Sequence, residues 1–398
     1  MHKIFLEIGI ILIATKLGAI LSNKFKMPKV LGALIAGIII GPSILGIVHS
    51  NEQIKFLSDL GVVMLMFGAG VETNLEELKK AGKTSFLIAV GGIVLPLILG
   101  FCGANLFFNN FWENLFIGVI LTATSVSITV QTLTELGKLN TRAGMNIVGA
   151  AVIDDILGLI LISFVLVLFQ ASQGSQSVNV LQSIGIVSLK VIAFCVISLL
   201  SIAFLPKYID KYIKKIGTRE RVGVFAIALA LIAAFIAEEL QIAAITGAYV
   251  CGLMLSKLEY KEYIENKVKT ISNYFLSPIF FASVGLAVNL ENMSAKILFL
   301  SLLLLLIAIL GKIIGCGLTA KVLRLKSSEA FQIGCGMVSR GEVALITTNI
   351  GLSNKIITPN LYVPTLIIVV ATTVVTPIFL KFSFSHKLEK SFDKNLNK

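Results

Sequence analysis

The stretch from Ala150 to Leu161 reads AAVIDDILGLIL and places two adjacent carboxylates, Asp154 and Asp155, inside a continuous apolar segment. A soluble core would not carry such a pair. At the centre of a membrane helix one charged side chain costs roughly 2.5 to 3.5 kcal/mol, so an ionisable residue at that depth indicates a functional site. The stretch therefore predicts a membrane protein whose function involves this acidic pair.

The composition supports a multi-pass membrane protein. Of the 398 residues, 56% are hydrophobic and 14% are charged, whereas a globular domain carries about 25% charged residues. The net charge of +12 comes from basic residues in short loops between apolar runs, which indicates membrane topology and not nucleic-acid binding. The first apolar segment lacks a cleavage site and is expected to remain as a span.

The sequence predicts no metal centre and no cofactor. The five cysteines are scattered singly in apolar segments, and two of the three histidines lie at the termini, so metal ligands with suitable spacing are absent from the sequence. Two glycine-rich runs, GCGLTA and GCGMVSRG, lack the strand, turn and helix that a dinucleotide site requires.

Cutting the chain at polar, Pro/Gly and charged clusters gives thirteen candidate spans. Most of them reach the length of about 20 residues that a membrane helix needs, while the eighth and ninth are short. Loops after odd-numbered spans, together with the C-terminal tail, hold 26 of the 34 Lys and Arg residues, against four on the opposite side. Basic residues collect on the cytoplasmic side, so the N-terminus is predicted outside and the C-terminus inside. The predicted spans are 4–22, 28–48, 54–71, 84–108, 114–137, 143–171, 181–205, 221–237, 241–256, 270–289, 296–320, 329–352 and 361–380.

The spans suggest two inverted repeats. The longest internal loop is strongly basic and divides the chain near its middle. Many transporters consist of two inverted halves, and an odd separation of seven spans would invert the second half here. The fold class is therefore an all-α polytopic membrane protein. The predicted parts are a membrane transporter domain over 1–380, with a first repeat 1–171, a linker helix 181–205 and a second repeat 221–380, and a short basic cytoplasmic tail over 381–398.

The acidic pair is predicted to lie near mid-membrane. Asp154 and Asp155 are about 11 residues, or ~17 Å, from the cytoplasmic start of span six. Neighbouring residues on a helix point about 100° apart, so the two carboxylates cannot face the same place. Lys312 in span eleven could pair with one of them, because buried charges are tolerated when they are matched. Its long side chain could instead reach the membrane surface.

Two further spans carry polar residues at a similar depth. Span twelve contains Arg340 and Glu342, which cannot face each other on a regular helix, so either the helix is interrupted near 339–341 or each side chain binds other helices. In span five, Thr124 and Ser125 either bond back to the helix backbone or, in a broken helix, offer neutral oxygen ligands for a hard cation such as Na⁺. The two spans are counterparts in the proposed repeats, so breaks in both would cross beside the aspartates.

Four motifs in this order resemble the monovalent cation/proton antiporter superfamily, in the branch that contains bacterial Na⁺/H⁺ antiporters and potassium efflux systems. They are TATS at Thr122–Ser125, VIDDILG at Val152–Gly158, GKIIG at Gly311–Gly315 and SRGEVA at Ser339–Ala344. The resemblance covers essentially the whole chain. It implies homodimers of thirteen-span protomers in which two broken helices cross. The efflux systems add a cytoplasmic nucleotide-binding domain that is not expected here.

The resemblance also implies roles for individual residues. Asp155 would be the carboxylate that binds Na⁺ and the proton, with Thr124 and Ser125 nearby, while Asp154 would pair with Lys312. A tandem acidic pair with a lysine is similar to electrogenic members. The expected function is therefore exchange of a monovalent cation, Na⁺ first and Li⁺ or K⁺ next, for protons by alternating access in the cell membrane.

Three other functions were weighed against this one. A sodium-coupled organic-anion symporter could use a similar inverted-repeat fold, but it would need a roomy substrate cavity. An intramembrane aspartyl protease needs carboxylates that face each other, which adjacent residues cannot do, so the protein is not expected to be an enzyme. An ion channel would lack the saturating, proton-coupled flux that the acidic pair suggests. The expected partners are membrane lipid and a second copy of the chain.

Overall fold

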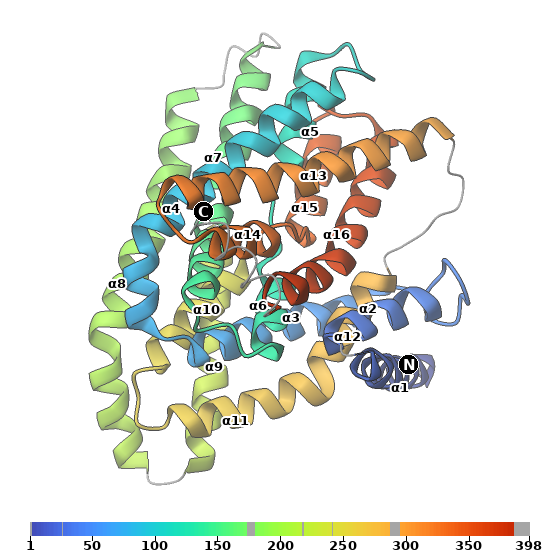
Figure 1. Ribbon diagram of the computed structural model, residues 1–398. Coiled ribbons are helices and arrows are strands. Elements are labelled where there is room, and N and C mark those ends of the chain that lie inside the picture. Colours follow the sequence, from blue (N-terminus) through green and yellow to red (C-terminus); the bar gives the residue numbers. More distant parts are fainter. Residues whose placement is uncertain are drawn as a thin grey trace, which may run out of the picture. The chain divides into compact units, whose positions relative to one another are not determined.

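A computed structural model describes residues 2–385, apart from residues 26, 173–179, 217–218, 241 and 287–294. The described residues form sixteen α-helices, a π-helical turn and a 3-10 turn, and no strand (Figure 1). In chain order they are α1 (His2–Lys24), α2 (Lys29–Ile40), α3 (Glu52–Glu72), α4 (Leu75–Ala104), α5 (Phe111–Ile120), α6 (Val126–Glu135), α7 (Arg142–Ser172), α8 (Val180–Ile216), α9 (Arg219–Glu239), α10 (Ala244–Leu255), α11 (Lys261–Ile271), η1 (Ser272–Leu276), α12 (Ser277–Leu286), α13 (Ala295–Val322), α14 (Ser327–Gly336), α15 (Glu342–Ser353), η2 (Pro359–Leu361) and α16 (Tyr362–Ser383).

The chain divides into two compact units, each built from segments that are far apart in sequence. Both units draw on the first and the second half of the chain, so each is closed by long-range packing. Unit 1 comprises Met1–Gly18, Ala33–Glu76 and Gly185–Leu286, and unit 2 comprises Ala19–Gly32, Glu77–Ile184 and Ala287–Lys398.

In unit 1, α3 packs closely against α10 because both helices carry glycine at the contact. A Cβ added to Gly252 would lie 2.8 Å from the Cα of Gly70, closer than real Cβ atoms come to a backbone atom. Small residues at a helix interface allow backbones to approach in this way, which increases the dispersion contact between membrane helices. An apolar core around Ile11, Ile54 and Ile279 joins α1, α3 and α12 of the same unit.

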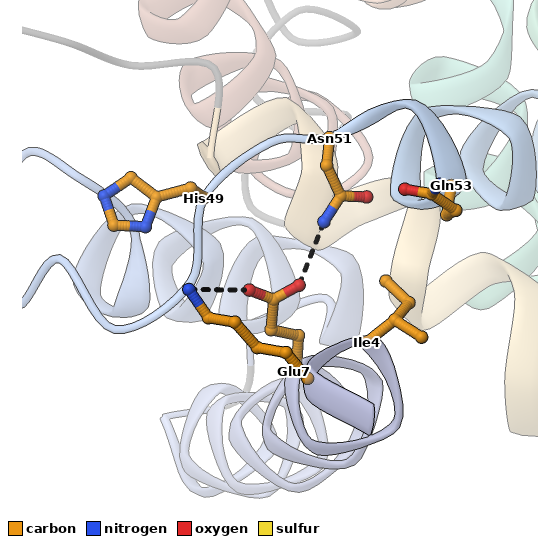
Figure 2. A pocket seen from close by; sticks show the side chains of 6 residues that line it. Ile4, Glu7, His49, Asn51 and Gln53 are labelled. Carbon is orange, nitrogen blue, oxygen red and sulfur yellow. Dashed lines mark hydrogen bonds and ion pairs between the residues drawn. The ribbon is translucent and has the colours of Figure 1, made fainter. Parts of the chain in front are cut away.

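Asn51 holds two of these helices at one end of unit 1. Its side-chain oxygen accepts a hydrogen bond of 2.9 Å from the backbone N–H of Ile54 and so caps the N-terminus of α3. Its Nδ2 donates to Glu7 of α1 at 2.9 Å. Figure 2 shows this clamp beside a surface pocket of about 570 Å³. The pocket is lined by Lys3, Ile4, Glu7, His49, Asn51 and Gln53.

Unit 2 is also assembled through glycines on facing helices. A Cβ on Gly315 of α13 would lie 2.5 Å from the carbonyl oxygen of Gly91 in α4, and one on Gly118 of α5 would lie 2.6 Å from the carbonyl oxygen of Leu97. The short helix α14 packs against the long helices α13 and α16, and the short helix α15 packs against α16, as Figure 1 shows in orange and red. This unit contains all seven residues that the sequence predicts for the site.

The all-helical, multi-pass class is confirmed, and a helix or a pair of helices lies at each predicted span. In the described part of the chain, eight helices are long and apolar enough to cross a membrane: α1, α3, α4, α7, α8, α9, α13 and α16. The short helices include α2, α5, α10 and α15. The count of thirteen crossings and the orientation stay predictions.

Three segments differ from the sequence-based boundaries. The helix α2 ends at Ile40, and a tight turn follows in which Gly46 has a φ of 59° and donates to the Gly41 carbonyl. The basic segment expected as a loop is helical up to Ile216, because α8 continues beyond the predicted linker.

The charged helix α11 was not predicted from the sequence, since only Ile264 and Val268 of it are buried. Residues 386–398 of the predicted tail lie outside the described residues.

Candidate functional site

Two helices of unit 2 are interrupted, and their interruptions touch. The first break separates α5 from α6 over residues 121–125, and the second separates α14 from α15 over residues 337–341. The backbone N–H of Ser125 donates to the carbonyl of Ser339 at 2.8 Å, and the Thr129 hydroxyl donates to the carbonyl of Gly336 at 2.8 Å. Predicted spans five and twelve are therefore each interrupted, and neither is a regular helix throughout.

Glycine is required where the two breaks meet. A Cβ on Gly341 would lie 2.7 Å from the hydroxyl oxygen of Ser125 and 2.8 Å from its Cβ. Any larger residue would push the two segments apart. We call the region formed by residues 121–125 and 337–341 the crossing.

Arg340 binds the broken helix ends. The side chain is fully buried, and its Nη2 donates to the carbonyls of Leu121 at 2.8 Å and Ala308 at 3.2 Å. Its Nη1 lies 3.4 Å from the carbonyls of Met337 and Val338. Leu121 caps the C-terminus of α5 and Met337 that of α14. The guanidinium thus supplies donors, and a positive charge, to the carbonyls of the two interruptions, which lack helical partners, and it also binds a carbonyl inside the continuous helix α13.

The acidic pair occupies α7, where Asp154 is 3% exposed and Asp155 is 6% exposed. Lys312 of α13 is fully buried, and its Nζ donates to the two carboxylate oxygens of Asp154 at 3.0 and 3.2 Å. Gly92 of α4 lies next to this amine: a Cβ there would be 3.4 Å from Nζ, and it would be only 2.5 Å from the sulfur of Cys316. The structure therefore brings together the ion pair that the resemblance implied, and Lys312 does not extend to the surface.

Asp155 points about 100° away from Asp154 around the α7 axis. The same helix packs on α6 and on α14, where Ile147 contacts Gly336 at the end of α14. Asp155 lies two helical turns beyond Ile147 on α7, or ~12 Å along the axis. Thr124 is 2% exposed and Ser125 is 7% exposed. Among the described residues, the Thr124 hydroxyl has no hydrogen-bond partner.

The comparison with known proteins assigns the family. Residues 10–385 match the transmembrane family described as sodium/hydrogen exchanger. The chain is 38% identical to the Na⁺/H⁺-K⁺ antiporter GerN of Bacillus cereus, over 97% of this chain and 97% of that protein. This chain belongs to the sodium/hydrogen exchanger family. The resemblance inferred from its motifs is thereby confirmed.

Two further relatives agree with this assignment. The exchanger is 35% identical to a Na⁺/H⁺ antiporter of Enterococcus hirae, over 94% of this chain and 96% of that protein. Its fold is similar to that of the sodium proton antiporter MjNhaP1 from Methanocaldococcus jannaschii, with a TM-score of 0.69, 21% identity and coverage of 97% of this chain and 98% of that chain. The family assignment does not support the organic-anion symporter alternative.

Several residues of the exchanger's site escaped the sequence analysis. The second break is held by α16, where the Arg340 N–H donates to the hydroxyl of Thr372 at 3.0 Å and the Thr373 hydroxyl donates to the Arg340 carbonyl at 2.9 Å. The only signal in the sequence is a pair of adjacent threonines in an apolar run. Ser339 was named only as part of a motif at the predicted interruption and was given no role of its own.

The remaining features of the site are Glu342 and the oxygen atoms that could bind a cation. Glu342 begins α15, and its side chain lies outside the described part of the structure. No group of three or more His, Cys, Asp or Glu side chains that could hold a metal ion occurs among the described residues. The crossing offers oxygen atoms from hydroxyls and backbone carbonyls, and the acidic pair of α7 offers carboxylate oxygens; all of these are ligand types that hard cations accept.

Proposed function

We propose that this exchanger transports a monovalent cation, with Na⁺ as the first candidate and Li⁺ or K⁺ as the others, against protons, and that both bind at Asp155. The proposal is supported above all by one observation: Asp155 is a buried carboxylate on α7, and this helix packs against α5, α6 and α14 of the two broken helices, whose interruptions carry neutral oxygens. The relatives in Bacillus cereus and Enterococcus hirae are named as Na⁺/H⁺ antiporters, and one of the names includes K⁺.

The mechanism is competition for one carboxylate. Na⁺ can bind only when Asp155 is ionised, because a protonated carboxyl has lost the negative charge that holds the cation. Thr124 and Ser125 lie at the start of the half-helix α6 and would add oxygen ligands beside it. A proton and a cation therefore occupy the site in alternation, and the cation is driven by the proton gradient.

Asp154 and Lys312 would couple a second proton to this cycle. A buried ammonium is tolerated while its carboxylate partner stays charged, so the pair gains or loses a proton as a unit. When a cation enters next to the pair, its positive charge disfavours the lysine proton. We expect release of that proton to make the exchange electrogenic, with one net charge moved for each cation.

Alternating access requires that the site move as one body. Its two breaks, acidic pair and lysine all lie within unit 2, which has its own apolar core. The α5/α6 and α14/α15 pairs would be the matching broken helices of two inverted repeats. The thirteen crossings, the external N-terminus, the internal C-terminus and a homodimer belong to the same proposal.

The test is proton flux in proteoliposomes with each alkali cation in turn. Asp155→Asn should abolish cation-dependent proton movement, because the amide cannot hold a cation or exchange a proton. Asp59→Asn, which changes an exposed aspartate of unit 1, is the control and should retain exchange. Exchange that persists in Asp155→Asn would refute the assignment. An imposed membrane potential should alter the wild-type rate if the cycle is electrogenic.

A further inference from the structure

Ser339 lies at the centre of the crossing, and its hydroxyl is not used by the protein. The residue is fully buried, and its Oγ has no hydrogen-bond partner among the described residues. A buried polar atom without a partner costs about 1 to 3 kcal/mol. Such an atom in a native structure points to a missing ligand, which can be a water molecule or an ion.

Four neighbouring hydroxyls, in contrast, have hydrogen-bond partners. The hydroxyls of Thr122, Thr129, Thr372 and Thr373 all donate to backbone carbonyls, at 2.7 to 2.9 Å. In a regular helix a serine bonds back to a carbonyl three or four residues earlier. Ser339 lies in the non-helical segment 337–341, where no such carbonyl is in place.

The backbone around Ser339 is fixed, so the side chain has little freedom to find another partner. Its carbonyl accepts from the Ser125 N–H at 2.8 Å, and the next residue, Arg340, is bound on both sides of its peptide by Thr372 and Thr373. The hydroxyl is therefore held at the point where the second break meets the first.

A second hydroxyl without a partner lies next to the same hydrogen bond. Thr124 precedes Ser125, and its Oγ1 is buried and has no hydrogen-bond partner in the described part of the chain. The Cα atoms of Thr124 and Ser339 are each two covalent bonds from one end of the Ser125–Ser339 hydrogen bond. Each break thus contributes one hydroxyl that lacks a partner at their meeting point.

The remaining oxygens of the second break are already engaged. The guanidinium of Arg340 takes the carbonyls of Met337 and Val338, and the Ser339 carbonyl binds Ser125. The guanidinium would repel a cation from the carbonyls that it binds. On the second break, the oxygen that stays free for a cation would therefore be a hydroxyl oxygen. Small hard cations prefer such oxygen ligands.

From these contacts we infer that Ser339 supplies an oxygen ligand to the transported alkali cation and helps to set the preference among alkali cations. The inference rests on the proposed function, since it adds a ligand from the second break to the site at Asp155. Ser339 and Thr124 would hold the cation from opposite breaks. The distance between the hydroxyl oxygens of Ser339 and Thr124 would then favour cations of one radius over others.

The experiment measures the apparent KM for Na⁺, Li⁺ and K⁺ in proteoliposomes for Ser339→Ala. Loss of one ligand should raise the KM for the preferred cation roughly tenfold, which corresponds to about 1.4 kcal/mol, with little change in kcat. The ratio of the KM values for Na⁺ and Li⁺ should change as well. Thr348→Val is the matched control, because its buried hydroxyl already donates to the Ala344 carbonyl at 2.8 Å.

A binding readout separates ligand loss from structural damage. Na⁺ should raise the melting temperature of the purified wild type and of Thr348→Val, and it should do so less in Ser339→Ala. Ser339→Cys, which keeps the shape of the side chain but replaces the oxygen by a larger and weaker acceptor, should show the same reduced stabilisation by Na⁺ as Ser339→Ala.

Two results would overturn the inference. One is wild-type KM values and a wild-type KM ratio in Ser339→Ala while Asp155→Asn is inactive, which leaves the proposed function intact. The other is misfolding of both Ser339 variants while Thr348→Val folds, since the hydroxyl would then serve the structure alone. Activity in Asp155→Asn would refute the proposed function itself.

Discussion

Replacing Arg340 by methionine should destabilise the protein, because the guanidinium satisfies carbonyls at two broken helices. Methionine fills a similar volume without donors. The Leu121 carbonyl at the first break would lose a bond of 2.8 Å, and the carbonyls of Met337 and Val338 at the second break would lose contacts of 3.4 Å, inside a fully buried environment. An unsatisfied buried acceptor costs about 1 to 3 kcal/mol, so the loss of donors at the two breaks costs ~2 to 6 kcal/mol.

Removing the arginine also relieves the cost of keeping a charge away from water, which lowers the net effect. We therefore expect a loss of ~2 to 4 kcal/mol, or at least about 4 °C in Tm, taking roughly 2 °C for each kcal/mol. The Tm of Arg340→Lys should lie between those of the wild type and Arg340→Met. The lysine ammonium lacks the planar, forked set of donors with which the guanidinium binds several carbonyls at once.

The assay is thermal unfolding of detergent-solubilised protein, followed by size-exclusion recovery. Arg142→Met is the matched control, because that side chain is 63% exposed and lies 3.7 Å from Glu329 in a surface ion pair. Such pairs contribute ~0 to 1 kcal/mol. If Arg340→Met melted within about 1 °C of Arg142→Met, the guanidinium would not be what stabilises the broken ends.

Three further substitutions test other parts of the fold. Lys312→Met should cost about 3 to 5 kcal/mol, because it leaves a buried carboxylate without its partner, and adding Asp154→Asn should recover much of the loss in thermal unfolding. Gly252→Ala should lower the Tm by forcing apart α3 and α10. Gly9→Ala is the control, because a Cβ there would meet nothing within 4 Å, and equal Tm values for the two variants would disprove a tight contact between α3 and α10. Asn51→Ala should lose about 1 to 2 kcal/mol from the cap of α3, and unchanged melting would contradict the capping role.

Hydrophobic patterning alone predicts most of the helices, because a membrane helix must satisfy its backbone internally and needs a long apolar run. The same reasoning failed for α11, whose charged residues gave the appearance of a loop although Ile264 and Val268 pack inward. It also ended the linker helix too early, since the basic residues after Leu205 extend α8 instead of interrupting it. A charge in the sequence shows where a helix meets a polar environment and not where the helix ends.

The site was predictable to a different extent. The two breaks followed from polar residues at matching depth, and an ion pair of Lys312 with one aspartate followed from the cost of buried charge. The partners of Arg340 did not, because Leu121 is 219 residues away and contributes only a backbone carbonyl, which every residue has. Thr372 and Thr373 were missed for the same reason, as both bind backbone atoms of the second break. Tertiary contacts to main-chain groups leave little trace in a single sequence.

In the proposed mechanism, the charges of the acidic pair, Lys312 and Arg340 would make the lysine proton decide how the exchanger couples its ions. Among the described side chains, Asp154 and Asp155 are balanced by Lys312 and Arg340, and Arg340 keeps its charge because it binds helix ends. If Na⁺ replaces only the proton on Asp155, the loaded and protonated sites carry the same net charge of about +1. If Lys312 also releases its proton, the sodium-loaded site is neutral and the protonated site is not. A low-dielectric environment favours the neutral loaded site, so the buried Asp154–Lys312 contact at 3.0 Å supports two protons for each cation.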